Sequence, residues 1–201
     1  MELPVSYQLN QGTEVVLDQM APEEVETVRS LFNAIVAEGT SYPQQTPLSP
    51  QGFADYWLKG SAYVVRVAAA PQICEETREH STVAKQPTTA VTTGNAANVL
   101  GAFYIKPNFP GRCGHICNAG FIVAPAARGQ GLGHVMGKAM LTLAKDLGYR
   151  AVMYNLVFET NVASLKIWQA LDFQEIGRIP QAAHLPDGRY VDAIMLYKSL
   201  V

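Results

Sequence analysis

One stretch of the chain constrains its fold more than any other, because it joins an apolar run, a glycine-rich loop and an amphipathic helix. The run covers residues 118–123 and is closed by Pro125, after which glycines stand at positions 129, 131 and 133. This order predicts a strand, a tight loop and a helix. The helix is indicated by apolar residues at the 3.6-residue period, which are Leu132, Val135, Met136, Ala139, Met140, Leu143 and Leu147.

A glycine loop that leads into a helix is suited to bind an anion. The first N–H groups of a helix have no partner within the helix, and the helix dipole adds about half a positive charge at that end. Glycines let phosphate oxygens approach the backbone, and Arg128 adds positive charge. The loop lacks the Lys-Ser/Thr pair of a nucleotide P-loop, and His134 stands where a dinucleotide loop needs its third glycine. A surface loop that only caps a core helix remains an alternative at this point.

Composition excludes several other classes of anion-binding protein. A net charge of −2 does not suit a nucleic-acid surface, which needs clustered Lys and Arg. No apolar run reaches the length of a membrane span, and the N-terminal residues do not have the form of a signal peptide. Cysteines at 74, 113 and 117 are odd in number and do not form a disulfide framework. We therefore expect a cytoplasmic chain with no nucleic-acid or membrane partner.

The rest of the chain predicts a single α/β (α+β) domain over residues 1–201, with a mixed, mostly antiparallel sheet of about seven strands and about four helices. We expect an extended tail at 1–12 and a long strand-to-strand insertion at 70–96. One helix opens at Pro22 and ends at Gly39, Ser49 caps a second, and a short helix follows Asn161. The expected strands cover 13–20, 61–69, 99–105, 118–123, 149–158, 173–179 and 191–197.

A second motif lies in the C-terminal third: Asn161-x-x-Ser164-x-x-Ile-Trp168-x-x-Leu-x-Phe173. Together with Arg128-x-x-Gly-x-Gly133 it resembles the GCN5-related N-acetyltransferases (GNAT), over most of the chain. The resemblance implies a GNAT-like sheet that opens between the fourth and fifth predicted strands, acetyl-CoA as cosubstrate and no metal. It also implies a set of acetyl-CoA-binding positions, including a backbone N–H from Ile122 or a neighbour: Phe121, Ile122, Val123, Arg128, Gly129, Gln130, Gly131, Leu132, Gly133, His134, Asn161, Ser164 and Trp168.

Further segments, Ile-Lys-Pro-Asn at 105–108, Cys-Asn-Ala-Gly-Phe at 117–121 and Asn-Leu-Val-Phe at 155–158, resemble the azetidine-2-carboxylate/cis-4-hydroxyproline N-acetyltransferases. That resemblance implies that Asn118 and Asn155 are the catalytic pair and flank the reacting nitrogen, and it suggests a homodimer. A neutral amide orients an amine but is too weak a base to deprotonate it. The family's usual tyrosine acid is replaced by Trp168, whose indole is only an N–H donor.

Other functions stay open at this point. The acceptor could be another small amine, such as a phosphinothricin-like amino acid or a polyamine, although the sequence has no acidic cluster for a polyamine. The missing tyrosine also fits a non-catalytic acetyl-CoA-binding regulatory module. Cys113-x-His115-x-Cys117 lacks the fourth ligand of a zinc site, and Glu159 is the best carboxylate candidate for receiving the amine's proton.

Overall fold

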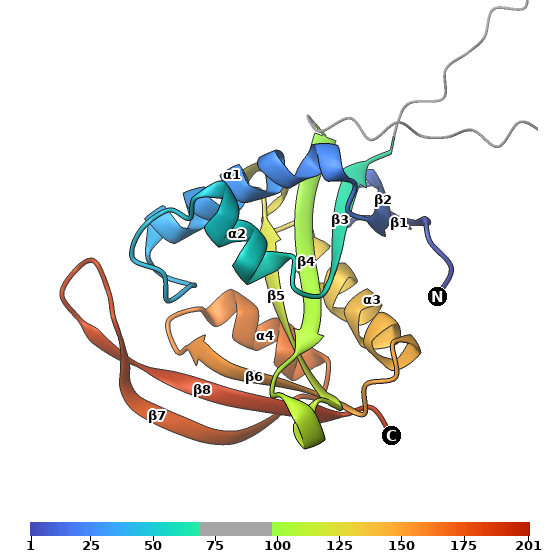
Figure 1. The fold of residues 1–201 in the computed structure, drawn as a ribbon. Coiled ribbons are helices and arrows are strands. Elements are labelled where there is room, and N and C mark those ends of the chain that lie inside the picture. The colour runs from blue at the N-terminus through green and yellow to red at the C-terminus, as the bar shows by residue number, and fades with distance from the viewer. Residues whose placement is uncertain (69–97) are drawn as a thin grey trace, which may run out of the picture.

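The computed structural model describes residues 1–68 and 98–201, so the expected insertion at 70–96 lies outside the described residues. The described strands form one eight-stranded sheet in the order β1-β2-β3-β4-β5-β6-β8-β7 (Figure 1). Only β5 and β6 are parallel, and α3 makes the crossover between them. The strands are β1 Val5–Gln8, β2 Glu14–Gln19, β3 Ser61–Val67, β4 Val99–Pro107, β5 Ile116–Val123, β6 Ala151–Phe158, β7 Gln174–His184 and β8 Tyr190–Ser199.

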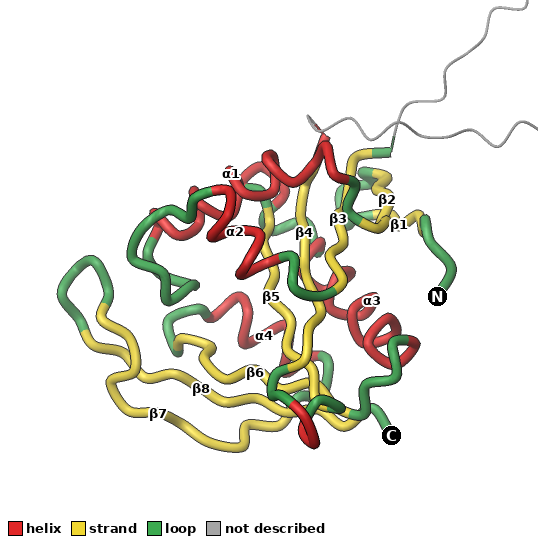
Figure 2. Tube along the Cα trace, viewed as in Figure 1, coloured by secondary structure: helices red, strands yellow, loops and turns green. Residues whose placement is uncertain are grey.

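Helices cover both faces of the sheet (Figure 2). Side chains of α1 and α2 pack on one face, and those of α3 and α4 pack on the other. No helix in residues 1–68 and 98–201 is long and apolar enough to cross a membrane. The mixed, mostly antiparallel α/β fold expected from the sequence is confirmed. The four α-helices of the described residues are α1 Val25–Glu38, α2 Pro50–Trp57, α3 Leu132–Asp146 and α4 Val162–Ala170.

Local sequence signals set several helix ends. The Ser49 side chain accepts a hydrogen bond from the N–H of Gly52, and Asn161 does the same for Ser164, so both residues cap helices as their positions suggest. Gly39 ends α1 in the left-handed region at φ 69°, which a residue with a Cβ adopts only at a cost. These ends follow from contacts that span no more than four residues.

The N-terminal segment corrects one expectation. Residues 1–12 do not form a free tail, because Val5–Gln8 pairs with β2 as an eighth strand and Leu9 is buried. The backbone N–H of Asn10 then donates to the carbonyl of Gln130, in the glycine loop. A four-residue edge strand has too short a pattern to be recognised alone, since its stability comes from the strand beside it.

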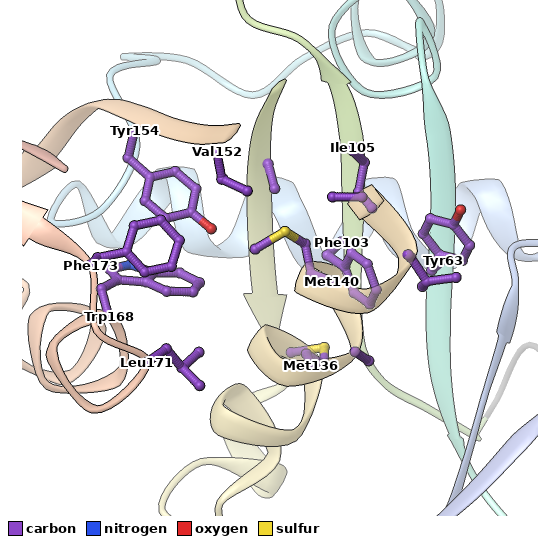
Figure 3. Close-up of a cluster of buried hydrophobic side chains, with 14 of the residues drawn as sticks. Tyr63, Phe103, Ile105, Met136, Met140, Val152, Tyr154, Trp168, Leu171 and Phe173 are labelled. Carbon is purple, nitrogen blue, oxygen red and sulfur yellow. The ribbon is translucent and has the colours of Figure 1, made fainter. Parts of the chain in front are cut away.

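The core behind the sheet holds α3 and α4 in place (Figure 3). Met136 and Met140 of α3 are fully buried in the cluster that also contains Phe103 of β4. Burying a side chain of this size stabilises the fold by about 1.5–3 kcal/mol. On the α4 side, the ring of Tyr154 stacks on Phe173 and lies 4.5 Å from the ring of Trp168, centroid to centroid.

The sheet opens between β5 and β6, and this opening positions the site. The two strands pair only at Ile116–Ala151 and Cys117–Val152, and then diverge, as Figure 1 shows. The register of β6 against β8 also shifts between Tyr154 and Val157. The shift marks a bulge, which turns side chains away from the regular alternation of a strand.

Candidate active site

A cavity of about 840 Å³ runs from the glycine loop to the opening between β5 and β6. All of the expected site residues line it except Ile122 and Gln130. The structure therefore brings the two sequence motifs and the two asparagines to one continuous space. The expected residues that line the cavity are Asn118, Phe121, Val123, Arg128, Gly129, Gly131, Leu132, Gly133, His134, Asn155, Asn161, Ser164 and Trp168.

Ile122 and Gln130 face elsewhere. Side chains alternate along a strand, so the side chain of Ile122 points into the core under α1 and α2, where it is 1% exposed. Its side chain is therefore not available to a ligand in the cavity. The side-chain amide of Gln130 donates to the carbonyl of Ala126 at 2.8 Å, which holds it in the loop itself.

The glycine loop has the geometry of an anion cradle. Gly129 and Gly131 lie in the left-handed region at φ 75° and 85°, and Gly131 is the N-cap of α3 with no side chain bonded to that end. A Cβ on Gly131 would also lie 3.0 Å from Nδ2 of Asn10. The first N–H groups of α3 are therefore left to a ligand, and the left-handed backbone of the loop favours glycine at both positions.

Arg128 lies beside this loop and is paired weakly. Its guanidinium donates to Glu38 at 2.7 Å, and both side chains are more than a third exposed. An ion pair of this kind contributes at most about 1 kcal/mol. Arg128 can therefore exchange Glu38 for a phosphate at small cost.

Two glycines let α4 approach α3 closely. A Cβ on Gly133 would lie 2.7 Å from Cδ1 of Ile167, and one on Gly137 would lie 2.7 Å from Cδ1 of Leu171. A larger residue at either position would have to displace the end of a side chain on the α4 side. The close packing places Ser164 and Trp168 of α4 on the same cavity as the glycine loop.

Trp168 takes the place of the expected tyrosine without its chemistry. The indole N–H donates to the hydroxyl of Ser164 at 2.7 Å, and the side chain is 4% exposed. Its ring packs against Phe121 and Tyr154. The indole has one N–H and no second proton to give, so Trp168 shapes the wall of the cavity.

Three asparagines, Asn108, Asn118 and Asn155, form a cluster at the acceptor end of the cavity, called the asparagine cluster below, and two of them, Asn118 and Asn155, line the cavity. Oδ1 of Asn108 accepts from Nδ2 of Asn118 at 3.2 Å and from Nδ2 of Asn155 at 2.6 Å. Nδ2 of Asn108 donates back to Oδ1 of Asn155 at 2.9 Å. Sequence reasoning assigned no role to Asn108; its position in the Lys-Pro-Asn segment was the available signal.

Aromatic rings form the wall beside this cluster, and one cation that does not itself line the cavity packs against two of them. Tyr42, Tyr56 and Tyr104 line the cavity, and the Tyr42 hydroxyl donates to the carbonyl of Phe121 at 2.8 Å. These tyrosines had not been assigned to the site from sequence. Tyr42 comes from a polar, proline-punctuated loop that passes over β5, and its ring packs against the α1 side of the core.

The cation is Lys106, which also had no assigned role. Its Nζ donates to the carbonyl of Tyr56 at 2.7 Å and lies 4.4 Å and 4.3 Å from the ring centroids of Tyr56 and Tyr104. Burial, with a smaller effect from Lys59, lowers the pKa of Lys106 from its ordinary value. Lys106 stands directly opposite Asn118 in the β4–β5 pairing, so both side chains lie on one face of the sheet.

Glu159 does not line the cavity. One carboxylate oxygen accepts from Arg178 at 2.9 Å, and the other accepts from the backbone N–H of Asp192 at 3.0 Å. These contacts hold the carboxylate on the β6–β8 side. Glu159 is therefore not placed to take a proton directly from an amine in the cavity.

The site combines an open sheet, an anion cradle at a helix N-terminus and a polar acceptor end. This combination is typical of an enzyme that transfers a group between two bound substrates. The sequence pattern of the Acetyltransferase (GNAT) family matches residues 52–173. N-acetyltransferase aca1 of Schizosaccharomyces pombe is 34% identical over 172 residues, which are 85% of this chain and 78% of that protein. The chain therefore belongs to the GNAT family of acetyltransferases, and it is an N-acetyltransferase of that type.

Other relatives agree on the fold. The structure of a GCN5-related N-acetyltransferase from Kribbella flavida has a TM-score of 0.74 and 26% identity, and it covers 92% of this chain and 97% of its own. The structure of yncA from Salmonella typhimurium with its cofactor acetyl-CoA has a TM-score of 0.72 at 13% identity, covering 93% and 94% of the two chains. The second likeness shows the fold alone.

Proposed function

We propose that this enzyme transfers the acetyl group of acetyl-CoA to the nitrogen of a small amino acid, of the proline-like imino acid class. One observation carries the proposal: a single cavity joins the anion cradle at Gly131 to the asparagine cluster. A donor bound at one end and an amine bound at the other would meet in the opening between β5 and β6. Holding both reactants there removes most of the entropic cost of their encounter.

The residues present fit acetyl-CoA. Backbone N–H groups of the glycine loop, with Arg128, would hold the pyrophosphate. The separation of β6 leaves backbone groups of β5 without a neighbouring strand, and these would bond the pantetheine amides in the way that a peptide adds to a sheet edge. Acetyl-CoA supplies the acetyl group as a thioester, and a β5 N–H would bind its oxygen as negative charge develops there.

Asn118 and Asn155 would hold the amino-acid substrate on the two sides of the opening, each through the polar atoms that its amide turns to the cavity. Amide groups accept hydrogen bonds from an amine and so direct its lone pair, but they do not take up its proton. That proton would leave to water, since Glu159 is held outside the cavity. The asparagines therefore act by orientation.

Charge at the acceptor end favours an amine that carries a carboxylate. Lys106 does not line the cavity, but it provides a partly buried ammonium against Tyr56 and Tyr104, which do, on the face that holds Asn118. Among the lining residues that the structure describes, Glu38 is the one carboxylate, and Arg128 already neutralises it. A polyamine would find no free negative charge there, whereas the carboxylate of an amino acid would be attracted to Lys106.

The test is release of free thiol from acetyl-CoA with a panel of acceptors. The panel contains azetidine-2-carboxylate, cis-4-hydroxyproline, phosphinothricin, spermidine and a peptide with a free N-terminus. We expect turnover with the cyclic imino acids and little with spermidine. Turnover with spermidine or the peptide alone would overturn the acceptor assignment while leaving the donor site in place.

Gly131→Asp tests the acetyl-CoA site independently of the amine site. A side chain at φ 85° is strained, and a carboxylate in the cradle repels a pyrophosphate. We expect the thermal stabilisation by acetyl-CoA to disappear, because a ligand stabilises only a fold that binds it. A variant that acetyl-CoA still stabilises as it does the wild type would contradict the cradle.

A further inference from the structure

Asn108 stands behind the two asparagines that face the cavity. It does not line the cavity, whereas Asn118 and Asn155 do. Its backbone N–H donates to the carbonyl of Ile116 at 2.8 Å, and the residue follows Pro107, which has a restricted backbone. Its side chain therefore reaches the cluster from a fixed point at the end of β4.

The hydrogen bonds to Asn108 determine which polar atoms of the Asn118 and Asn155 amides remain free for a ligand. An amide carries one acceptor oxygen and an NH₂ with two donor hydrogens. One N–H of Asn118 is engaged by Asn108, which leaves its second N–H and, as its one acceptor, Oδ1 of Asn118 to a ligand. The amides of Asn155 and Asn108 form a cyclic pair of hydrogen bonds, in which each donates one N–H to the oxygen of the other. The second N–H of Asn155 is left to donate to a ligand.

We infer that Asn108 is a positioning residue that sets this polarity, so that Asn118 presents an acceptor and Asn155 a donor to the substrate. This inference rests on the proposed function and deepens it. An acceptor beside a donor is complementary to a substrate that has an N–H beside a carboxylate or carbonyl oxygen, as an amino or imino acid has. Asn118 then orients the amine, and Asn155 holds the neighbouring oxygen.

Asn108→Asp tests the inference, because it changes few atoms. The ionised carboxylate still accepts from both neighbouring amides, but it has no N–H for Oδ1 of Asn155 and places an oxygen against it. At about pH 8 we expect kcat/KM for the imino acid to fall about 10-fold, the effect of losing one buried hydrogen bond. The KM for acetyl-CoA should stay within about 2-fold, since the donor site is untouched.

The pH profile separates positioning from a merely structural role. A protonated carboxyl has one O–H donor and one carbonyl acceptor, the same pattern as the asparagine amide. The ratio of variant to wild-type kcat/KM should therefore rise as the pH falls from about 8 to about 4, where an aspartate of ordinary pKa is about half protonated. Protonation of the amine affects both proteins and cancels in the ratio.

Gln174→Glu is the matched control, because it adds the same charge on the exposed edge strand β7. Its ratio to wild type should stay near one at every pH. A flat ratio for Asn108→Asp, or a kcat/KM equal to that of the wild type, would overturn the inference. If a lower Tm of Asn108→Asp fully accounted for its lower activity, that result would also overturn the inference.

A readout without turnover makes the two proposals separable. In the ligand-free protein labelled with ¹⁵N, the side-chain NH₂ signals of Asn118 and Asn155 should exchange slowly, because each donates to Asn108. Asn108→Asp should shift the Asn155 signals at about pH 8 and restore them toward acid. Wild-type protein inactive on every amine would sink the proposed function, whereas unshifted signals in the variant would sink this inference alone.

Discussion

Two polar clusters in this chain use similar hydrogen bonds for different purposes. In the first, which we call the Glu24 cluster, Glu24 is fully buried and accepts from Arg66 at 2.8 Å and from the N–H of Ala21 at 2.8 Å. Arg66 also bonds Asp18 at 3.1 Å. In the asparagine cluster, all members are neutral and two of them face a cavity.

The difference lies in what each cluster leaves unused. The Glu24 cluster joins β2, β3 and the turn before α1, and opposite charges satisfy one another there. The asparagine cluster leaves the oxygen of Asn118 free to accept, and one N–H each of Asn118 and Asn155 free to donate. A closed, charged cluster holds elements together, whereas an open, neutral one is prepared to bind a ligand.

The largest expected effect is on the Glu24 cluster. Glu24→Ala leaves the guanidinium of Arg66, which is 13% exposed, without its main partner. Removing one side of a buried ion pair costs about 3–5 kcal/mol, which lowers Tm by roughly 10 °C or more in a chain of this size. Thermal unfolding followed by circular dichroism measures it.

Glu23→Ala is the control for that substitution, because Glu23 is the exposed neighbouring acid. Its Tm should stay within about 2 °C of the wild type, as is usual for exposed sites. If Glu24→Ala and Glu23→Ala both have the Tm of the wild type, the Glu24 cluster does not stabilise the fold and the comparison fails.

The second effect, smaller in free energy, falls on activity. Asn118→Ala removes a hydrogen-bonding group worth about 1–3 kcal/mol, so kcat should fall about 10- to 100-fold. Acetyl-CoA affinity and Tm should change little, because the residue is at the acceptor end. Steady-state kinetics with calorimetric titration of acetyl-CoA measures both quantities, and unchanged turnover would remove Asn118 from the mechanism.

The smallest effect concerns Lys106. Lys106→Met keeps much of the packing on Tyr56 and Tyr104 but removes the charge. The preference of the enzyme for an amino-acid acceptor over the same acceptor with a carboxamide in place of its carboxylate should fall about 5-fold at neutral pH. This change corresponds to about 1 kcal/mol. The KM values of the two acceptors measure this preference.

The same preference should depend on pH in the wild type. The pKa of Lys106 is lowered, chiefly by burial, so the ammonium loses its proton at a lower pH than an exposed lysine does. The preference for the carboxylate should therefore decline as the pH rises toward 10.5, the ordinary value. Lys106→Met should show no such decline, and a parallel decline in both proteins would exclude Lys106 as its cause.

The sequence by itself determined the features that depend on neighbouring residues. The strand–loop–helix stretch, the left-handed glycines, the caps at Ser49 and Asn161 and the motif on α4 follow from backbone conformation and from hydrogen bonds over a few residues. They were enough to predict the α/β fold and the family, and most of the predicted site residues do line the cavity. The acceptor assignment of Asn118 and Asn155 came from resemblance and stays a prediction.

Only the tertiary structure decided how the acceptor end is built. Asn108 meets Asn155 across 47 residues, and Tyr42 meets Phe121 across 79. Strand register places Lys106 beside Asn118, and the bulge in β6 alters the alternation at Asn155. Strand β1, which the sequence did not predict, likewise forms only because it pairs with β2. Contacts of this kind depend on how distant strands align, and no local pattern of residues encodes that alignment.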